Sequence, residues 1–117
     1  MKTIEEMKES YDWQEAFAYA GFTMDDVECV IASDDGENDG QSWIAVFHLK
    51  NDSYAYLEAG CYYTGWDCQA DGTCWVKTTL EEIQRWDMPK TSRVRLGMTL
   101  ADLDGDQHIS ALNEEPK

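Results

Sequence analysis

Residues 42–60 read SWIAVFHLKNDSYAYLEAG, and this stretch decides the fold. Two runs rich in aromatic and β-branched side chains, 42–49 and 54–60, stand on either side of a polar segment that contains Asn51 and Asp52. Asn and Asp tolerate the positive φ that tight hairpin turns require. The stretch therefore predicts a β-hairpin.

A third strand is predicted at Thr73–Thr78, where Cys-Trp-Val follows the turn signal Asp71-Gly72. We expect the sheet to be antiparallel, with about three strands. No long linker or internal repeat interrupts the chain. We therefore expect residues 1–100 to form a single domain and residues 101–117 to form an acidic C-terminal tail.

Helical patterns lie outside the predicted strands. Residues 1–20 carry apolar side chains near helical spacing, and Gly21 supplies the stop. Residues 23–31 begin with a helix cap and continue as a second, short helix or as a strand. Residues 79–86 start with a capping box, and Pro89 ends that helix. Helices outside a run of strands indicate the α+β class, with the helices packed on one face of the sheet.

The net charge is strongly negative and unevenly distributed. The chain has 24 Asp and Glu against 9 Lys and Arg, a net charge of −15 with a pI near 4.2. Residues 1–40 hold 12 acidic and 2 basic residues, a net charge of −10, and residues 101–117 hold 5 acidic and 1 basic, a net charge of −4. Such a field disfavours direct binding to nucleic acid or anionic membranes and favours basic protein partners. The alternative is that the acidity only keeps the protein in solution.

The chain shows no sign of export or membrane insertion. No apolar run approaches the ~20 residues that span a bilayer. The start, Met1–Glu6, lacks the apolar core of a signal peptide. We therefore expect a cytoplasmic protein in which the four cysteines are reduced thiols, namely Cys29, Cys61, Cys68 and Cys74.

Residues 60–69 combine three large aromatic side chains and two thiols in a segment between two strands. Loops normally avoid that much apolar surface. In one interpretation Gly65 allows a bend that places Trp66 in the core, with Asp67 forming an Asx turn. In the other, Tyr63 and Trp66 are exposed anchors for a partner, because aromatic side chains dominate interface energetics.

Two loop motifs, Glu37-Asn38-Asp39-Gly40 and Tyr63-Thr64-Gly65-Trp66-Asp67-Cys68-Gln69, together with 56–61 and 92–97, carry a resemblance. Over residues 12–100 the chain resembles a family of small, acidic, uncharacterised bacterial and bacteriophage proteins. The family has no established function to transfer. The resemblance implies a bacterial or phage origin and a family hallmark in the two loops, with the tail after residue 100 as an addition.

The tail contains a pattern similar to the start of an EF-hand calcium loop. Asp102, Asp104 and Asp106 occupy positions 1, 3 and 5 of that pattern. Position 6, which requires Gly for the turn, is Gln107, and position 12, which requires a bidentate Glu, is Asn113. The pattern is degenerate, and weak calcium binding is the hypothesis that it leaves open.

The cysteines offer two further hypotheses. Their spacing, six residues between Cys61 and Cys68 and five between Cys68 and Cys74, is wider than the C-x₂₋₄-C knuckles typical of zinc sites. A catalytic cysteine needs a neighbouring base, and the chain offers only His48 and His108. Neither zinc binding nor cysteine catalysis is favoured by these patterns.

The function that uses the magnitude and clustering of the charge is binding without catalysis. We expect an acidic protein that inhibits or masks a basic, nucleic-acid-handling protein, as a DNA mimic of the anti-defence (anti-CRISPR) or immunity type, without a cofactor. A calcium- or zinc-binding module and a small cysteine-dependent enzyme are the alternatives. The sequence leaves the oligomeric state open. The predicted partner-binding residues are Asp34, Asp35, Glu37, Asp39, Tyr63, Trp66 and Asp67.

Overall fold

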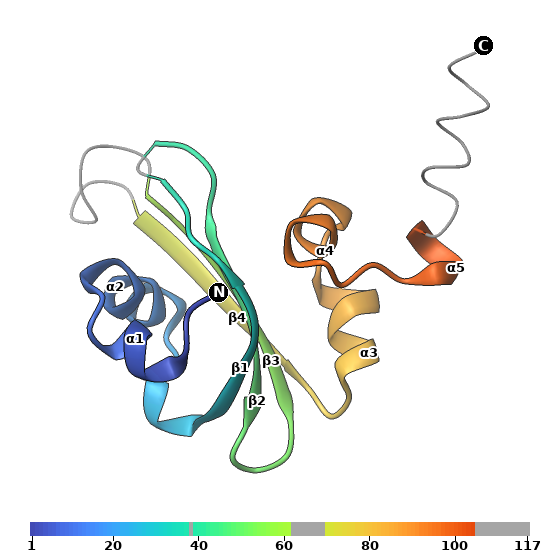
Figure 1. Cartoon of the computed structure of the whole chain (residues 1–117), viewed down its shortest axis with the longest axis horizontal. Helices are drawn as coiled ribbons and strands as arrows, with labels where there is room; N and C mark the ends of the chain where they lie inside the picture. Colours follow the sequence, from blue (N-terminus) through green and yellow to red (C-terminus); the bar gives the residue numbers. More distant parts are fainter. Residues whose placement is uncertain (38, 62–69, 105–117) are drawn as a thin grey trace.

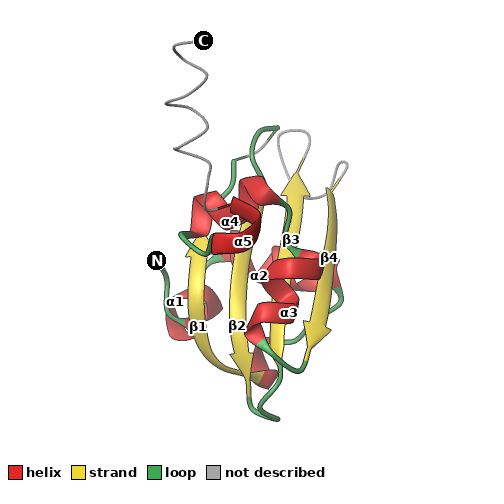
Figure 2. Ribbon diagram, turned by 90° about the vertical axis from the view of Figure 1, so that its right-hand side faces the viewer, coloured by secondary structure: helices red, strands yellow, loops and turns green. Residues whose placement is uncertain are grey.

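The computed structural model describes residues 1–37, 39–61 and 70–104. Its centre is a four-stranded antiparallel sheet in which the strands lie in the order β1-β2-β3-β4 (Figures 1 and 2). The α+β class and the antiparallel pairing are confirmed. The strands are β1 (Val27–Asp34), β2 (Trp43–Leu49), β3 (Tyr54–Cys61) and β4 (Ala70–Lys77).

The predicted hairpin is β2 and β3, and the predicted third strand is β4. Asp52 has the positive φ, 69°, that the hairpin turn was expected to need. The fourth strand comes from the segment for which a helix and a strand were both open. It contains both: Thr23 caps a 3₁₀ turn, η1 (Met24–Asp26), after which the chain extends into β1.

Helices cover both faces of the sheet rather than one (Figure 1). One face carries α1 (Ile4–Lys8) and α2 (Tyr11–Ala20), which we call the N-terminal layer. The other carries α3 (Leu80–Glu82), η2 (Ile83–Asp87), α4 (Lys90–Leu96) and α5 (Ala101–Asp104), the C-terminal layer. The physical reason lies in β2, where every side chain except His48 is buried. An almost continuous apolar run, instead of alternation, indicates a strand that is covered on both sides.

The first twenty residues form two helices instead of one. Ser10 interrupts the helical pattern, because its Oγ accepts a hydrogen bond from the backbone N–H of Trp13 at 3.2 Å and so caps α2. Gly21 ends α2 in the left-handed region, with φ 69°, as predicted. The capping box at Thr79 and Glu82 is also confirmed.

Two apolar clusters fill the space between the layers. Under the N-terminal layer, the rings of Phe17 and Phe47 lie 5.2 Å apart beside the fully buried Trp13. Under the C-terminal layer, Tyr56 stacks on Trp75 at 5.3 Å, and its hydroxyl donates a 2.7 Å hydrogen bond to Ser92 in α4. Burial raises the pKa of Tyr56 to about 12, so its phenol stays protonated.

Candidate binding surface

The acidic segment at the end of β1 contacts both helical layers. Asp34 accepts a 2.9 Å hydrogen bond from Nε of Arg95 in α4. Asp35 turns to the other layer, where Oδ1 accepts from the indole N–H of Trp13 at 2.8 Å. Its Oδ2 forms a 3.3 Å ion pair with Lys2. Successive residues of an extended chain project to opposite faces. The two neighbouring carboxylates therefore hold opposite layers on the sheet.

The loop that follows, residues 35–42, is held through hydrogen bonds to its backbone carbonyl groups. Arg95 donates to the carbonyl oxygens of Asp35 and Ser42, at 3.3 and 2.9 Å. Gln41 donates to the carbonyl of Asp35 at 2.8 Å. A Cβ on Gly36 would lie 2.6 Å from the ring of Trp43, so the loop also packs closely on the sheet. The two ends of this loop, at Asp35 and Ser42, are thus held by α4.

Two of the four predicted loop carboxylates, Asp34 and Asp35, form ion pairs, and the other two are exposed. Glu37 and Asp39 are exposed, and neither has an ion-pair partner among the described residues. Asp39 adopts φ 59°, and its N–H donates to the carbonyl of Cys61. That bond places the first loop motif beside the start of the aromatic segment. Tyr63, Trp66 and Asp67 themselves lie outside the described residues.

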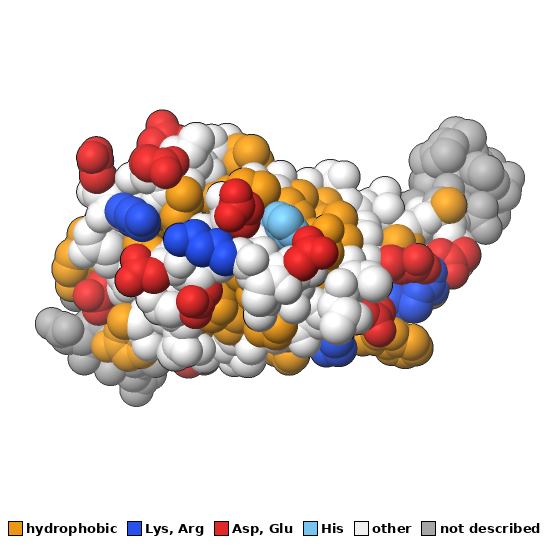
Figure 3. Space-filling model, turned by 90° about the horizontal axis from the view of Figure 1, so that it is seen from below, with side chains coloured by type: hydrophobic (Ala, Val, Ile, Leu, Met, Phe, Trp, Pro, Cys, Tyr) orange, Lys and Arg blue, Asp and Glu red, His pale blue; other side chains and the backbone are white. Residues whose placement is uncertain are grey.

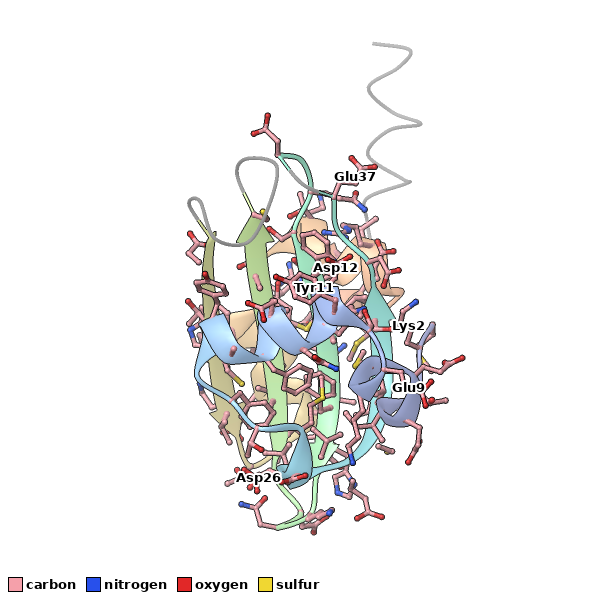
Figure 4. All side chains as sticks on the ribbon, turned by 90° about the vertical axis from the view of Figure 1, so that its left-hand side faces the viewer. Lys2, Glu9, Tyr11, Asp12, Asp26 and Glu37 are labelled. Atoms are coloured by element: carbon pink, nitrogen blue, oxygen red, sulfur yellow. The ribbon has the colours of Figure 1, made fainter. Side chains whose placement is uncertain are left out.

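Further acidic side chains lie on the N-terminal layer, and the sequence motifs did not predict them as binding residues. Figure 4 shows Tyr11 and Asp12 at the N-terminal end of α2, between Glu9 at the α1–α2 turn and Glu37 on the loop. Tyr11 is 61% exposed, an unusual fraction for an aromatic side chain. The charge count over residues 1–40 was the signal that could have found them. We call the following set the acidic face: the exposed Glu9, Asp12, Glu37 and Asp39 and the half-buried Glu15, with Tyr11 and Tyr19.

Three of the four basic residues of the C-terminal layer form ion pairs, Arg85 and Arg93 within the layer and Arg95 with Asp34 of β1, whereas Lys90 is exposed. Arg85 binds Asp102 at 2.7 Å and Glu81 at 2.8 Å, and Lys77 binds Asp87 at 2.8 Å. Figure 3 shows acidic and basic side chains in contact at the end of the molecule that carries this layer. Residues 71–104 hold 6 acidic and 5 basic residues, a net charge of −1. The negative field of the described residues therefore comes from the N-terminal side.

Two of the three predicted calcium ligands are held by arginine. Asp104 is buried and accepts from Nε and Nη2 of Arg93 at 2.7 and 2.9 Å, while Asp102 accepts two hydrogen bonds from Arg85. The arginine contacts lower the pKa of both carboxyl groups, that of Asp104 to about 2. Asp106 lies outside the described residues. Within residues 1–37, 39–61 and 70–104, no cluster of three or more His, Cys, Asp or Glu side chains is arranged to hold a metal ion.

The described thiols lie in different surroundings. Cys61 is fully buried, and burial raises the pKa of the Cys74 thiol to about 12, opposite to the shift that activates a nucleophile. Cys29 is exposed on β1. The imidazole of His48 is 2.8 Å from Asp52 and packs beside Tyr54 at the hairpin. Cys68 and His108 lie outside the described residues.

None of the helices in the described part of the chain is long and apolar enough to cross a lipid bilayer. None of the protein-family models, curated proteins or solved structures with which the chain was compared matches it, so the family resemblance seen in the sequence stays a prediction.

Proposed function

We propose that this chain is a non-enzymatic acidic binding protein of bacterial or phage origin that inhibits or masks a basic, nucleic-acid-handling protein. One observation carries the proposal. Arg85 and Arg93 of the C-terminal layer bind carboxylates of that layer and Arg95 binds Asp34, whereas exposed carboxylates gather on the N-terminal layer and its adjoining loop. A surface of this kind attracts a groove lined by Lys and Arg, in which its carboxylates replace phosphates.

The acidic face is held by the core beneath it. Trp13 and Phe17, on the inner side of α2, are buried against the sheet, so the outer side of the helix is fixed in position. Asp12 and Glu15 are one helical turn apart on α2 and carry like charges. A fixed array of like charges binds an opposite array without first paying the entropy of ordering it.

Tyr11 supplies an apolar contact at the centre of these charges. Exposed aromatic side chains are enriched among the residues that dominate binding energy. Tyr63, Trp66 and Asp67 keep their predicted role as further contacts. The hydrogen bond from Asp39 to Cys61 supports that role, because it places the chain that leads into this segment beside the acidic loop.

The test is affinity capture from bacterial lysate on the immobilised protein, followed by elution with salt and with a DNA duplex. We expect a nucleic-acid-binding protein that is retained at low ionic strength and is released by either eluent, because DNA and the acidic face compete for one groove. Retention that is insensitive to both eluents would contradict the proposal.

A matched pair of variants locates the surface. Glu9→Lys/Glu37→Lys reverses two charges on the acidic face. Asp25→Lys/Asp26→Lys reverses two exposed charges at η1, and Figure 4 shows Asp26 at the end of the sheet opposite to Glu37. Both doubles change the net charge equally. We expect the first to lose the captured protein and the second to keep it. Equal losses would show that net charge alone, and not the acidic face, governs retention.

A further inference from the structure

The two edges of the sheet are built differently. On the β1 edge, the pairing with β2 shifts register between Val27 and Cys29 and again between Val30 and Ala32. The N-terminal segment also approaches this edge, because the backbone N–H of Lys2 donates to Ser33 Oγ at 3.1 Å. Bulges and covering segments are the devices by which proteins keep an edge strand from pairing with another chain.

The β4 edge lacks these devices in its described part. Eight consecutive residues of β4 pair with β3 without a register shift, from Lys77 opposite Tyr54 to Ala70 opposite Cys61. The strand contains no proline, and residues 72–76 (GTCWV) carry no charge. Val76 is 48% exposed. A regular and largely uncharged edge is a template for strand addition.

Charge along β4 is confined to two positions near its ends. Asp71 and Lys77 are six residues apart and therefore lie on the same face of the sheet, the face that carries the C-terminal layer. In an antiparallel pair, residues that stand directly opposite each other also share a face. When two β4 strands pair antiparallel, Asp71 of each strand can therefore stand opposite Lys77 of the other.

We propose that β4 pairs antiparallel with β4 of a second copy of this chain, about a twofold axis at Cys74, so that the two sheets form one continuous sheet of eight strands. In this register each Asp71 stands opposite the Lys77 of the other copy, Thr73 stands opposite Trp75, and Gly72 opposite Val76. Symmetric registers with any other centre separate Asp71 from Lys77. The twofold symmetry makes both charge pairs form together.

The ends of the strand can accommodate these pairs. Lys77 already binds Asp87 at 2.8 Å within its own subunit, and an ammonium group has three donors, so it can bridge both carboxylates. Inside the subunit Asp71 lies near Glu58, whose pKa is raised by burial and by the charge of Asp71. A cation opposite Asp71 would add to the charge of Arg95, which already lowers the pKa of Glu58.

Added salt should change the affinity of this contact and that of docking through the acidic face in opposite directions. Two copies that each carry −15 repel each other at long range, and added salt screens that repulsion. Self-association should therefore strengthen with salt, whereas binding of the acidic face to a basic groove should weaken. The two proposals can thus fail independently.

The test is sedimentation velocity of the full chain over a range of protein concentrations, at about 0.05 M and about 0.5 M NaCl. We expect a reversible monomer–dimer equilibrium that favours the dimer at the higher salt. The decisive variants are Asp71→Lys and its control Asp26→Lys, which change the net charge equally. Asp71→Lys places lysines opposite each other at both ends of the contact and should weaken dimerisation about tenfold. Asp26→Lys only reduces the general repulsion and should strengthen it slightly.

A second measurement does not depend on a variant. Amide hydrogen exchange of the wild-type chain should show that alternate backbone N–H groups of β4 become protected as the protein is concentrated, while β1 is unchanged. A chain that stays monomeric at both salt concentrations would overturn the proposal. So would equal shifts for Asp71→Lys and Asp26→Lys, or concentration-dependent protection at β1 in place of β4.

Discussion

Replacing Asp35 by alanine tests whether this residue holds the fold together rather than a partner. The substitution removes the acceptor of the Trp13 indole N–H, 2.8 Å away, and the ion-pair partner of Lys2. Trp13 is fully buried, and an unsatisfied buried donor costs about 1–3 kcal/mol. The Lys2 pair is exposed and is worth about 0.5 kcal/mol.

The size of the effect follows from the exposure of the carboxylate. The side chain of Asp35 is 55% exposed, so water can partly replace it at the indole. We therefore expect the lower part of the range, a loss of about 1–2 kcal/mol in the free energy of unfolding. For a domain of this size that loss lowers the melting temperature by roughly 5–10 °C. Thermal and urea unfolding followed by circular dichroism measure both quantities.

Two companion variants separate the contributions. Glu37→Ala removes the same charge from the same loop at an exposed position and should change stability by less than about 0.5 kcal/mol. Asp35→Asn keeps an oxygen that can accept from Trp13 and should recover most of the loss. If Asp35→Ala were as stable as Glu37→Ala, the assignment of Asp35 to the fold would be refuted.

Two further predictions concern the C-terminal layer. Tyr56→Phe should lower the free energy of unfolding by about 1 kcal/mol, because it removes the buried hydrogen bond to Ser92. In the Tyr56→Phe background, Ser92→Ala should lower it little further. A double-mutant cycle of urea unfolding measures both effects. Asp104, with its pKa lowered to about 2, contributes stability that is present above the unfolded pKa near 4 and is lost as pH falls toward 2. Acid unfolding of Asp104→Asn should therefore show a smaller loss of stability across that interval than the wild type, and parallel acid profiles would contradict the ion pair with Arg93.

The local signals of the sequence predicted several elements correctly. The β2–β3 hairpin, β4, the stop at Gly21 and the capping box at Thr79 all depend on neighbouring residues, and the structure contains each of them. The C-terminal layer was harder to place. Its helices cover the second face of the sheet, which was predicted to be open to water. The nearly continuous apolar run of β2 was the signal that both faces are covered.

Long-range pairing explains what could not be predicted about the binding surface. Asp34 and Asp35 belong to one acidic run in the sequence, and nothing local distinguishes them from Glu37 and Asp39. Their partners lie far away along the chain, since Arg95 is 61 residues from Asp34. Such pairs arise from how the layers are stacked, so only the structure shows which carboxylates remain available to a partner.

The contacts that Asp34 and Asp35 make with the two layers also affect the order in which the chain can complete its fold. During synthesis the N-terminal layer and the four strands emerge before the residues that cover the second face, where Ile44, Val46 and Tyr56 are buried. Until residues 83–98 have left the ribosome, that face stays open and Asp34 lacks its counter-ion. Nascent chains with exposed apolar surface are prone to aggregate. The negative charge of residues 1–40, which are synthesised first, should therefore keep incomplete copies apart while the last helices are being made, because like charges repel.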